Sequence, residues 1–405
     1  MTYQPGPGSS PWNPPPPPGP AGGPAQWHEG PQQQSPYPGP GSQAPQPSGG
    51  AQTPPEQWSM PPEPQSLPPF NLPPTPSPKS WVKWVVIAVV VVVLAAAAVA
   101  VVLVKGTGPS AGGSDTVSAA PSDVASGGDK GPATIVVEDV SCDAQGPIFT
   151  NFYDGMKASG FYDLDHSVAA SLWSPEERRS YDEAKRVTEV VIAQMGPLAK
   201  LTPHRVRREL YEQAIAYWQA WIDKLPTYVG SDNAYRAAGT EAEKALVRMC
   251  TAIQYKSAQA RSFLADPPVA PKDSATVTSE TPQLFLADRA DKCSEFSASF
   301  VAFFDDPVIK QWQKIDYKTG ASGWDSNQRQ ISDQAADIII ELARKLAGLG
   351  GDSGNPVMAD FTALGAQYLT AYARALPSYT SSDDPLYGAG ASLMRAVNEA
   401  CGAAG

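Results

Sequence analysis

The chain has 405 residues, a formal net charge of −11 and four cysteines. This length allows two or three domains. The acidic balance lacks the basic excess of a nucleic-acid-binding protein, so we expect no nucleic-acid partner. The cysteines show no C-x-x-C spacing, which argues against zinc ribbons and thioredoxin-like redox motifs.

Residues 1–80 form a proline-rich tail that contains 27 of the 43 prolines and one lysine, Lys79. Such a segment cannot bury enough apolar surface to offset the entropy of ordering it, so we predict that it is disordered. Two roles remain open for it. It either docks a cytoplasmic partner, because proline-rich segments bind aromatic grooves, or it acts only as a spacer.

Residues 81–105 are predicted to form a transmembrane helix. Trp84–Val104 has no charged or polar side chain, and at about 1.5 Å per residue it would span roughly 31 Å, about one bilayer core. A cleaved signal peptide is the alternative, but its apolar stretch is only about 7–15 residues long and it stands close to the N-terminus. Residues 106–133, rich in Gly and Ser, are predicted to be a flexible stalk.

The rest of the chain repeats itself without gaps at a fixed step of 151 residues. The step relates several pairs of identical residues: Cys142 and Cys293, Cys250 and Cys401, Trp173 and Trp324, Tyr228 and Tyr379. Self-similarity at a fixed offset indicates an internal duplication. We therefore predict two tandem modules, residues 134–266 and 284–405, joined by a linker over residues 267–283.

The duplication also selects one disulfide pairing. Four cysteines allow three pairings, but an ancestral single module could pair only its own two cysteines. We therefore predict the disulfides Cys142–Cys250 and Cys293–Cys401. Because disulfides persist in oxidising compartments, both modules should lie outside the cytoplasm, with the N-terminal tail inside it.

Each module has the pattern of a helical bundle with about four helices. In the third helix of module one, five apolar residues recur at helical spacing, namely Val206, Leu210, Tyr217, Trp221 and Leu225. Ser174 with Glu177 forms a capping box before the second helix. The predicted fold class is therefore all-α, with a disordered tail, one transmembrane helix and two tandem duplicated bundles.

A proline- and glycine-rich tail, an alanine- and valine-rich membrane helix and a small exported domain stand in that order over residues 1–133 and beyond. In this composition and order the chain resembles actinobacterial, mycobacterial-type, proline-rich single-pass membrane proteins of the cell envelope. The resemblance implies a compartment, and it names neither a ligand nor an activity.

No catalytic motif is present among H-E-x-x-H, G-x-S-x-G and Walker A sequences, so we predict no catalytic, cofactor or metal site and no enzyme activity. The feature that only module one carries is a cluster of His204, Arg205 and Arg208 at the start of its third helix. A helix N-terminus with added arginines can hold an anion or an acidic partner. Alternatively, the cluster is a solvated face on which Arg208 pairs with Glu212.

The predicted function is a membrane-anchored binding or scaffolding protein outside the cytoplasm, which acts on an unidentified protein or ligand of the envelope. Two alternatives remain. One is an enzyme, or an enzyme accessory, that acts on envelope material. The other is a small-ligand carrier with an apolar pocket in each bundle.

Overall fold

The computed structural model describes residues 124–271, 282–288 and 290–405. These ranges contain ten α-helices and no strand, and they fall in one compact unit, Ala119–Gly405. The first repeat contains α2 (Ser141–Ala158), α3 (Pro175–Leu201), α4 (Arg205–Lys224), α5 (Asn233–Gln254) and α6 (Ser257–Arg261). The second contains α7 (Cys293–Asp305), α8 (Pro307–Trp312), α9 (Ser326–Gly351), α10 (Pro356–Ala375) and α11 (Asp384–Ala403).

The 151-residue step relates the helices of the two repeats almost residue by residue. It takes α3 to α9, α4 to α10 and α5 to α11, and it relates the short 3₁₀ helices in the same way. These are η3 (Ala170–Leu172) with η7 (Ala321–Gly323), η4 (Leu225–Thr227) with η8 (Leu376–Ser378), and η5 (Gly230–Asp232) with η9 (Ser381–Asp383). Three further 3₁₀ helices are η1 (Ala125–Gly128), η2 (Phe161–Asp163) and η6 (Ser262–Leu264).

The repeats differ most in their first helix. The continuous α2 of the first repeat corresponds to α7 and α8 in the second, which are separated at Asp306–Pro307. Proline lacks the backbone N–H and clashes with the preceding turn, so it starts helices and rarely continues them. The Asp306 carboxylate accepts hydrogen bonds from the backbone N–H groups of Val308 (2.7 Å) and Ile309 (3.2 Å), which fixes the new start.

The predicted helix start signals are present. Ser174 and Glu177 form a capping box at α3, and Asp325 and Gln328 form one at α9. Because each pair satisfies two backbone donors that the first turn leaves free, the helices begin where the sequence pattern places them. The ring of Trp173 lies 5.7 Å from the guanidinium carbon of Arg178, which holds the chain as it enters α3.

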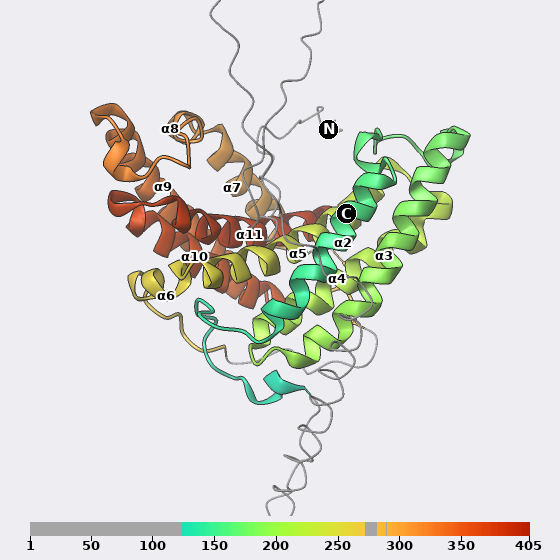
Figure 1. Cartoon of the computed structure of the whole chain (residues 1–405), viewed down its shortest axis with the longest axis horizontal. Coiled ribbons are helices and arrows are strands. Elements are labelled where there is room, and N and C mark those ends of the chain that lie inside the picture. Colours follow the sequence, from blue (N-terminus) through green and yellow to red (C-terminus); the bar gives the residue numbers. More distant parts are fainter. Residues whose placement is uncertain (1–123, 272–281, 289) are drawn as a thin grey trace, which may run out of the picture. The chain divides into compact units, whose positions relative to one another are not determined.

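The two repeats pack on each other through their equivalent last helices. Helices α5 and α11 form the most extensive helix pair in the unit, and Figure 1 shows them side by side between the other helices of the two repeats. The buried apolar residues of both repeats form one continuous cluster. The repeats are therefore two halves of one core.

Reciprocal contacts give the unit an approximate two-fold symmetry. The Tyr217 hydroxyl of α4 donates to the carbonyl of Leu286 (3.4 Å), in the segment that leads into the second repeat. The equivalent Tyr368 hydroxyl of α10 accepts from the backbone N–H of Val136 (3.2 Å), in the segment that leads into the first repeat. Each leading segment thus packs on the third helix of the other repeat, the reciprocal pattern of a self-complementary two-fold interface.

The disulfides follow the pairing that the duplication predicts. Cys142 is joined to Cys250, and Cys293 to Cys401, each with a Cα–Cα distance of 5.4 Å, within the usual range for a disulfide. The first links α2 to α5, and the second links α7 to α11. Each bond therefore ties the first helix of its repeat to the last.

The tandem bundles are fused through α5 and α11 and share one core. The predicted fold class needs correction in one respect. Among the helices of residues 124–271, 282–288 and 290–405, none has the length and apolar character needed to cross a membrane, so the predicted transmembrane helix is not supported. The predicted tail (1–80), membrane segment (81–105) and most of the stalk lie outside the described residues.

Candidate functional site

The cluster at the start of α4 is buried, contrary to the sequence-based expectation of a surface for partners. Arg205 and Arg208 are each 2% exposed, and Arg207 between them is fully buried. All three guanidinium groups pair with carboxylates inside the protein. The prediction that Arg205 and Arg208 present a binding face was therefore wrong, because side chains that are buried and paired cannot meet a partner outside.

Arg205 joins the two repeats. Its Nε and Nη2 atoms donate to the two carboxylate oxygens of Asp360 in α10, at 2.8 and 2.9 Å. Its Nη1 donates to the backbone carbonyls of Asp129 and Gly131, both at 3.0 Å. Bidentate pairs of this kind fix both distance and orientation. Arg205 therefore locks α4 against α10 and holds the leading segment in place.

Glu209 lies next to this pair and occupies the position in its repeat that Asp360 occupies in the other. The Glu209 side chain is 1% exposed, and neither carboxyl oxygen has a hydrogen-bond partner. Arg205 and Arg208 both approach it at 3.9 Å. Burial, and next the Asp360 carboxylate, raise the pKa of Glu209 well above its usual range. Arg205 thus contacts both of these equivalent acids, Asp360 at 2.8 Å and Glu209 at 3.9 Å.

Arg208 also contacts Glu212, the pairing that the sequence offered as the alternative. Its Nε lies 3.5 Å from the Glu212 carboxylate, one turn further along α4. Its Nη1 donates to the hydroxyl of Ser126 at 3.2 Å. This pair is buried rather than solvated, because the leading segment covers it.

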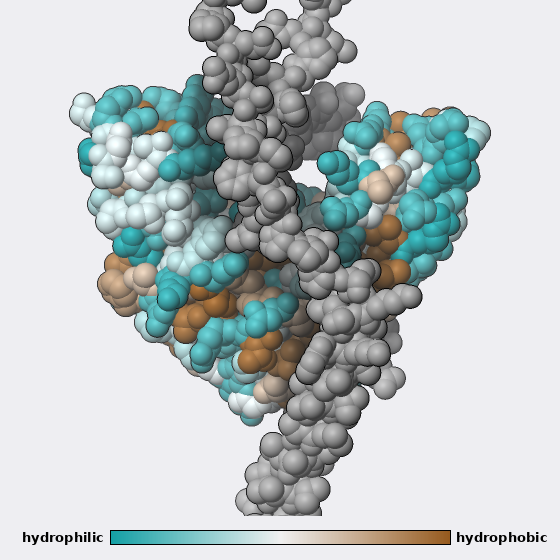
Figure 2. Space-filling view, viewed as in Figure 1, coloured by the Kyte–Doolittle hydropathy of each residue, from teal (hydrophilic) through white to brown (hydrophobic). Residues whose placement is uncertain are grey.

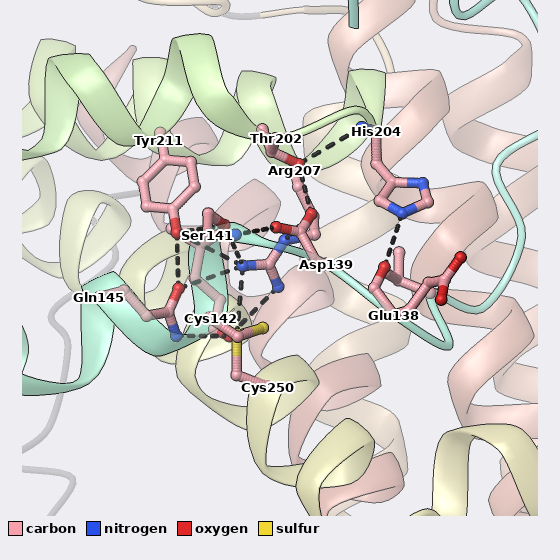
Figure 3. Close-up of polar contacts among 12 residues, drawn as sticks. Glu138, Asp139, Ser141, Cys142, Gln145, Thr202, His204, Arg207, Tyr211 and Cys250 are labelled. Atoms are coloured by element: carbon pink, nitrogen blue, oxygen red, sulfur yellow. Dashed lines mark hydrogen bonds and ion pairs between the residues drawn. A yellow bond between two sulfur atoms is a disulfide. The ribbon is translucent and has the colours of Figure 1, made fainter. Parts of the chain in front are cut away.

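Arg207 is the centre of a polar network behind the first disulfide (Figure 3). Its Nε lies 3.0 Å from the Asp139 carboxylate, and its Nη2 is 3.3 Å from the sulfur of Cys250. The same Nη2 donates to Ser141 Oγ and Gln145 Oε1, both at 3.1 Å. The network therefore connects α4 to α2 and places a cation against the disulfide.

Asp139 connects the start of α2, the residue after α3 and the start of α4. One carboxylate oxygen accepts from the backbone N–H of Ser141 (2.7 Å) at the start of α2, and the other accepts from the hydroxyl of Thr202 after α3. Burial alone would raise the pKa of Asp139, but the Arg207 charge and the hydrogen bonds from Ser141 and Thr202 outweigh it and lower that pKa. Asp139 thus remains the anionic partner of Arg207.

His204 lies at the edge of the network and is half-buried. Its ring turns away from Arg207, and Nε2 donates to the backbone carbonyl of Glu138 at 2.8 Å (Figure 3). Three exposed aliphatic side chains flank the Asp139–Thr202 contact nearby, namely Val137 (42% exposed), Val140 (64%) and Leu201 (45%). Of the predicted site, only His204 is therefore partly accessible, and it lies near these aliphatic side chains.

The second repeat has no counterpart of this network. The 151-residue step takes Asp139 to Ala290, Gln145 to Phe296 and Arg207 to Met358. The same disulfide therefore has apolar residues behind it in one repeat and a charged pair in the other. Because both copies fold in the same way, the charged pair is not required for the fold of a repeat.

The comparisons with known proteins fit the described unit. The family model for mycobacterial ESX-1 associated protein matches residues 124–405. This chain belongs to that family. A protein of Mycolicibacterium smegmatis (strain MKD8), described as uncharacterized, is 38% identical over 299 residues, which cover 73% of this chain and 77% of that protein. No solved structure matches.

Membership of the ESX-1 associated family supports the mycobacterial-type resemblance. The sequence carried that resemblance on residues 1–133, whereas the family model matches the double repeat. The single-pass membrane part of the resemblance gains no support. Within residues 124–405, the residues that differ between the two repeats are the candidates for a functional role.

A second polar pair that only the first repeat carries lies between α2 and α5. The hydroxyl of Tyr153 donates to Glu243 Oε2 at 2.5 Å. Glu243 is fully buried, and its other carboxyl oxygen has no hydrogen-bond partner. Burial raises the pKa of Glu243 to about 7, although the hydrogen bond from Tyr153 lowers it. The second repeat has Phe304 and Met394 at these positions.

In the second repeat the same region is a small, partly open apolar hollow with a cavity volume of about 10 Å³. It is lined by residues of α7, α9, α10 and α11: Phe300, Phe303, Phe304, Ile339, Leu342, Leu369, Tyr387, Ala391 and Met394. Trp218 stands in the first repeat where the second has Leu369, and its ring packs against Phe152 with a centroid distance of 4.9 Å. The smaller leucine leaves the space that the hollow occupies.

Sequence reasoning missed the residues that carry most of these contacts. The predicted site included the neighbours of Arg207 but not Arg207 itself, and it did not include Asp139 or Glu243. One signal was available, because aligning the two repeats marks each of these positions as a charge in one copy and an apolar residue in the other. In the described ranges, no group of three or more His, Cys, Asp or Glu side chains is arranged to hold a metal ion.

Proposed function

We propose that the double repeat is a rigid binding body that associates with the mycobacterial secretion system ESX-1 outside the cytoplasm, without chemically changing its partner. The observation that carries this proposal is the extent of the family match. It covers residues 124–405, the same stretch that the two disulfides and the shared core make into one unit. The match therefore supports the folded double repeat as the part that would associate with ESX-1.

The fused architecture supports a binding role. Each disulfide closes a loop of 108 residues, which in the chain-entropy model stabilises a fold by up to about 4.7 kcal/mol. The shared core and the Arg205–Asp360 pair hold the repeats in one arrangement. A preorganised surface loses little conformational entropy when it binds, which favours recognition.

The disulfides also support the proposed compartment. Such bonds are rare in proteins of a reducing cytoplasm and persist in exported ones. Here each repeat contains one, and the described residues include no free cysteine. We therefore place the double repeat outside the cytoplasm.

The proposed contact surface is the apolar rim above the first disulfide, defined as Val137, Val140 and Leu201. These side chains are exposed although they adjoin a tightly bonded segment. Figure 2 shows that hydrophobic residues also lie on the lower part of the face it displays, among hydrophilic ones. Apolar groups that remain on a rigid surface are common features of protein interfaces.

In-cell crosslinking of the full-length chain in a mycobacterium, followed by mass spectrometry, tests the association. We expect crosslinks from the double repeat to an ESX-1 component. Replacing Val140 and Leu201 together with aspartate should reduce these crosslinks several-fold without lowering the melting temperature. The matched control replaces Val190 and Val301, which are 59% and 53% exposed elsewhere.

Two results would contradict the proposal. If the rim variant and the control crosslink equally well, the rim is not the contact surface. If the purified protein turns over an envelope substrate, the enzyme alternative replaces the binding role. Copurification of an apolar small molecule would instead favour the carrier alternative.

A further inference from the structure

The two disulfides stand in different surroundings although their positions in the repeats are equivalent. Cys142 and Cys250 are half-buried, whereas Cys293 and Cys401 are 0% and 3% exposed. The first disulfide is therefore the more accessible of the two to an external thiol in the folded protein. The second is closed off by the core, so it opens only if the surrounding structure opens.

The charge next to the sulfur also differs. Arg207 is fully buried and directs Nη2 at Cys250 Sγ from 3.3 Å (Figure 3). In the second repeat Met358 stands at this position, and Ala290 replaces the anionic partner Asp139. A cation in contact with a cysteine stabilises its thiolate and so lowers the thiol pKa below the ordinary value of about 8.5. Only the first disulfide has this neighbour.

We propose that the Cys142–Cys250 disulfide is a thiol–disulfide exchange site that accepts electrons from a dithiol, whereas Cys293–Cys401 is a permanent structural bond. The thiolate of the dithiol attacks Cys142 Sγ, the Cys142–Cys250 bond breaks, and Cys250 leaves as a thiolate beside Arg207. The second thiol of the dithiol, as its thiolate, then attacks the mixed disulfide and releases Cys142. The dithiol is oxidised to its disulfide, and its two protons pass to the reduced pair or to solvent.

The assignment of Cys250 as the leaving group follows from the geometry. Exchange is faster when the leaving sulfur is the better stabilised thiolate. Cys142 stands at the start of α2, where the helix dipole supplies the equivalent of about half a charge. Cys250 has the guanidinium group of Arg207 within 3.3 Å, where Nη2 can donate directly to the leaving sulfur although Asp139 pairs with Nε. The helix dipole acts equally on Cys293 at the start of α7, so it does not distinguish the two disulfides, whereas Arg207 does.

Reduction at this site would act on one repeat only. It removes the covalent link between α2 and α5 and leaves the link between α7 and α11 intact. The polar network of Asp139, Ser141 and Gln145 still connects α2 to Arg207. The first repeat thus has a bond that can open while the rest of the unit keeps its fold.

The test uses the oxidised full-length protein and dithiothreitol as the dithiol. Samples are quenched with N-ethylmaleimide at successive times, and peptide mapping follows each disulfide separately. We expect Cys142–Cys250 to open at least about tenfold faster than Cys293–Cys401, at a rate proportional to the dithiothreitol concentration. Equal rates, or an opening rate independent of dithiothreitol, would overturn the proposal, because both mean that opening depends on unfolding.

A repeat-exchange variant tests the role of the charge. Arg207→Met with Asp139→Ala installs the residues of the second repeat and leaves no unpaired charge. We expect this double variant to slow the reduction of Cys142–Cys250 by dithiothreitol by about tenfold. Trp173→Ala is the control, because it destabilises the same repeat without touching the network and should leave the rate near that of the wild type. An unchanged rate in the double variant, or equal slowing in the control, would refute the role of Arg207.

Trapping with reduced glutathione tests the direction of attack. Because glutathione has one thiol, it can be captured as a mixed disulfide while N-ethylmaleimide blocks the sulfur that leaves. We expect glutathione on Cys142 and N-ethylmaleimide on Cys250. The reverse distribution would overturn the assignment of Cys250 as the leaving group.

Discussion

The buried carboxyl group of Glu243 makes the stability of the fold depend on pH. Its folded-state pKa is about 7, against an ordinary value of 4.5, and the main cause is burial. A shift of about 2.5 units corresponds to about 3 kcal/mol. The folded state holds the proton of Glu243 more tightly than the unfolded chain does. The resulting stabilisation of the folded state is therefore fully present below about pH 4.5. It is lost as the pH rises to about 7.

The perturbation is Glu243→Gln, which cannot ionise and can still accept the hydrogen bond from Tyr153. Urea unfolding of the full-length protein at pH 5 and pH 8, followed by circular dichroism, measures the free energy of unfolding. We expect the loss of stability between these two pH values to be up to about 3 kcal/mol smaller in the variant than in the wild type. The control, Glu176→Gln, replaces an exposed glutamate of α3 and should behave like the wild type.

Tyr153→Phe gives an independent check with a defined sign. The hydrogen bond from Tyr153 lowers the pKa of Glu243, so its removal should raise that pKa further. The pH range in which stability falls should therefore move to higher pH. If Glu243→Gln keeps the full pH dependence of the wild type, or if Tyr153→Phe moves the range to lower pH, the reasoning from burial is refuted.

Three further predictions concern the forces that stabilise the folded unit. Asp360→Ala leaves Arg205 buried without its main partner and should destabilise the unit by about 3–5 kcal/mol. A loss below about 1 kcal/mol in urea unfolding would mean that the pair contributes little to stability. Trp324→Ala removes a ring that is 6% exposed and should cost about 3–5 kcal/mol, whereas a wild-type melting temperature would argue that the ring is not packed. Replacing Cys293 and Cys401 together with alanine should lower stability by about 2–5 kcal/mol, and calorimetry without such a shift would contradict a structural role for this bond.

Local and repeated features of this protein could be predicted from the sequence. The capping boxes at Ser174 and Asp325 act within one turn of helix, so the residues that decide them are neighbours in the chain. The disulfide pairing followed from the duplication, because the two copies must fold alike. The predicted tail and membrane segment fall on residues that the structure does not describe.

Only the tertiary structure decided how the repeats combine and which charges are buried. Arg205, Arg207 and Arg208 look like a solvated helix start, since charged residues are mostly exposed. Their burial depends on groups distant in the chain, such as Asp360, 155 positions from Arg205. Because the free energy of a buried charge depends on the partner that reaches it, and α4 is covered on several sides, no local pattern could show it. The position of Glu209 opposite Asp360 likewise required the two-fold packing, which exists only once α5 and α11 have met.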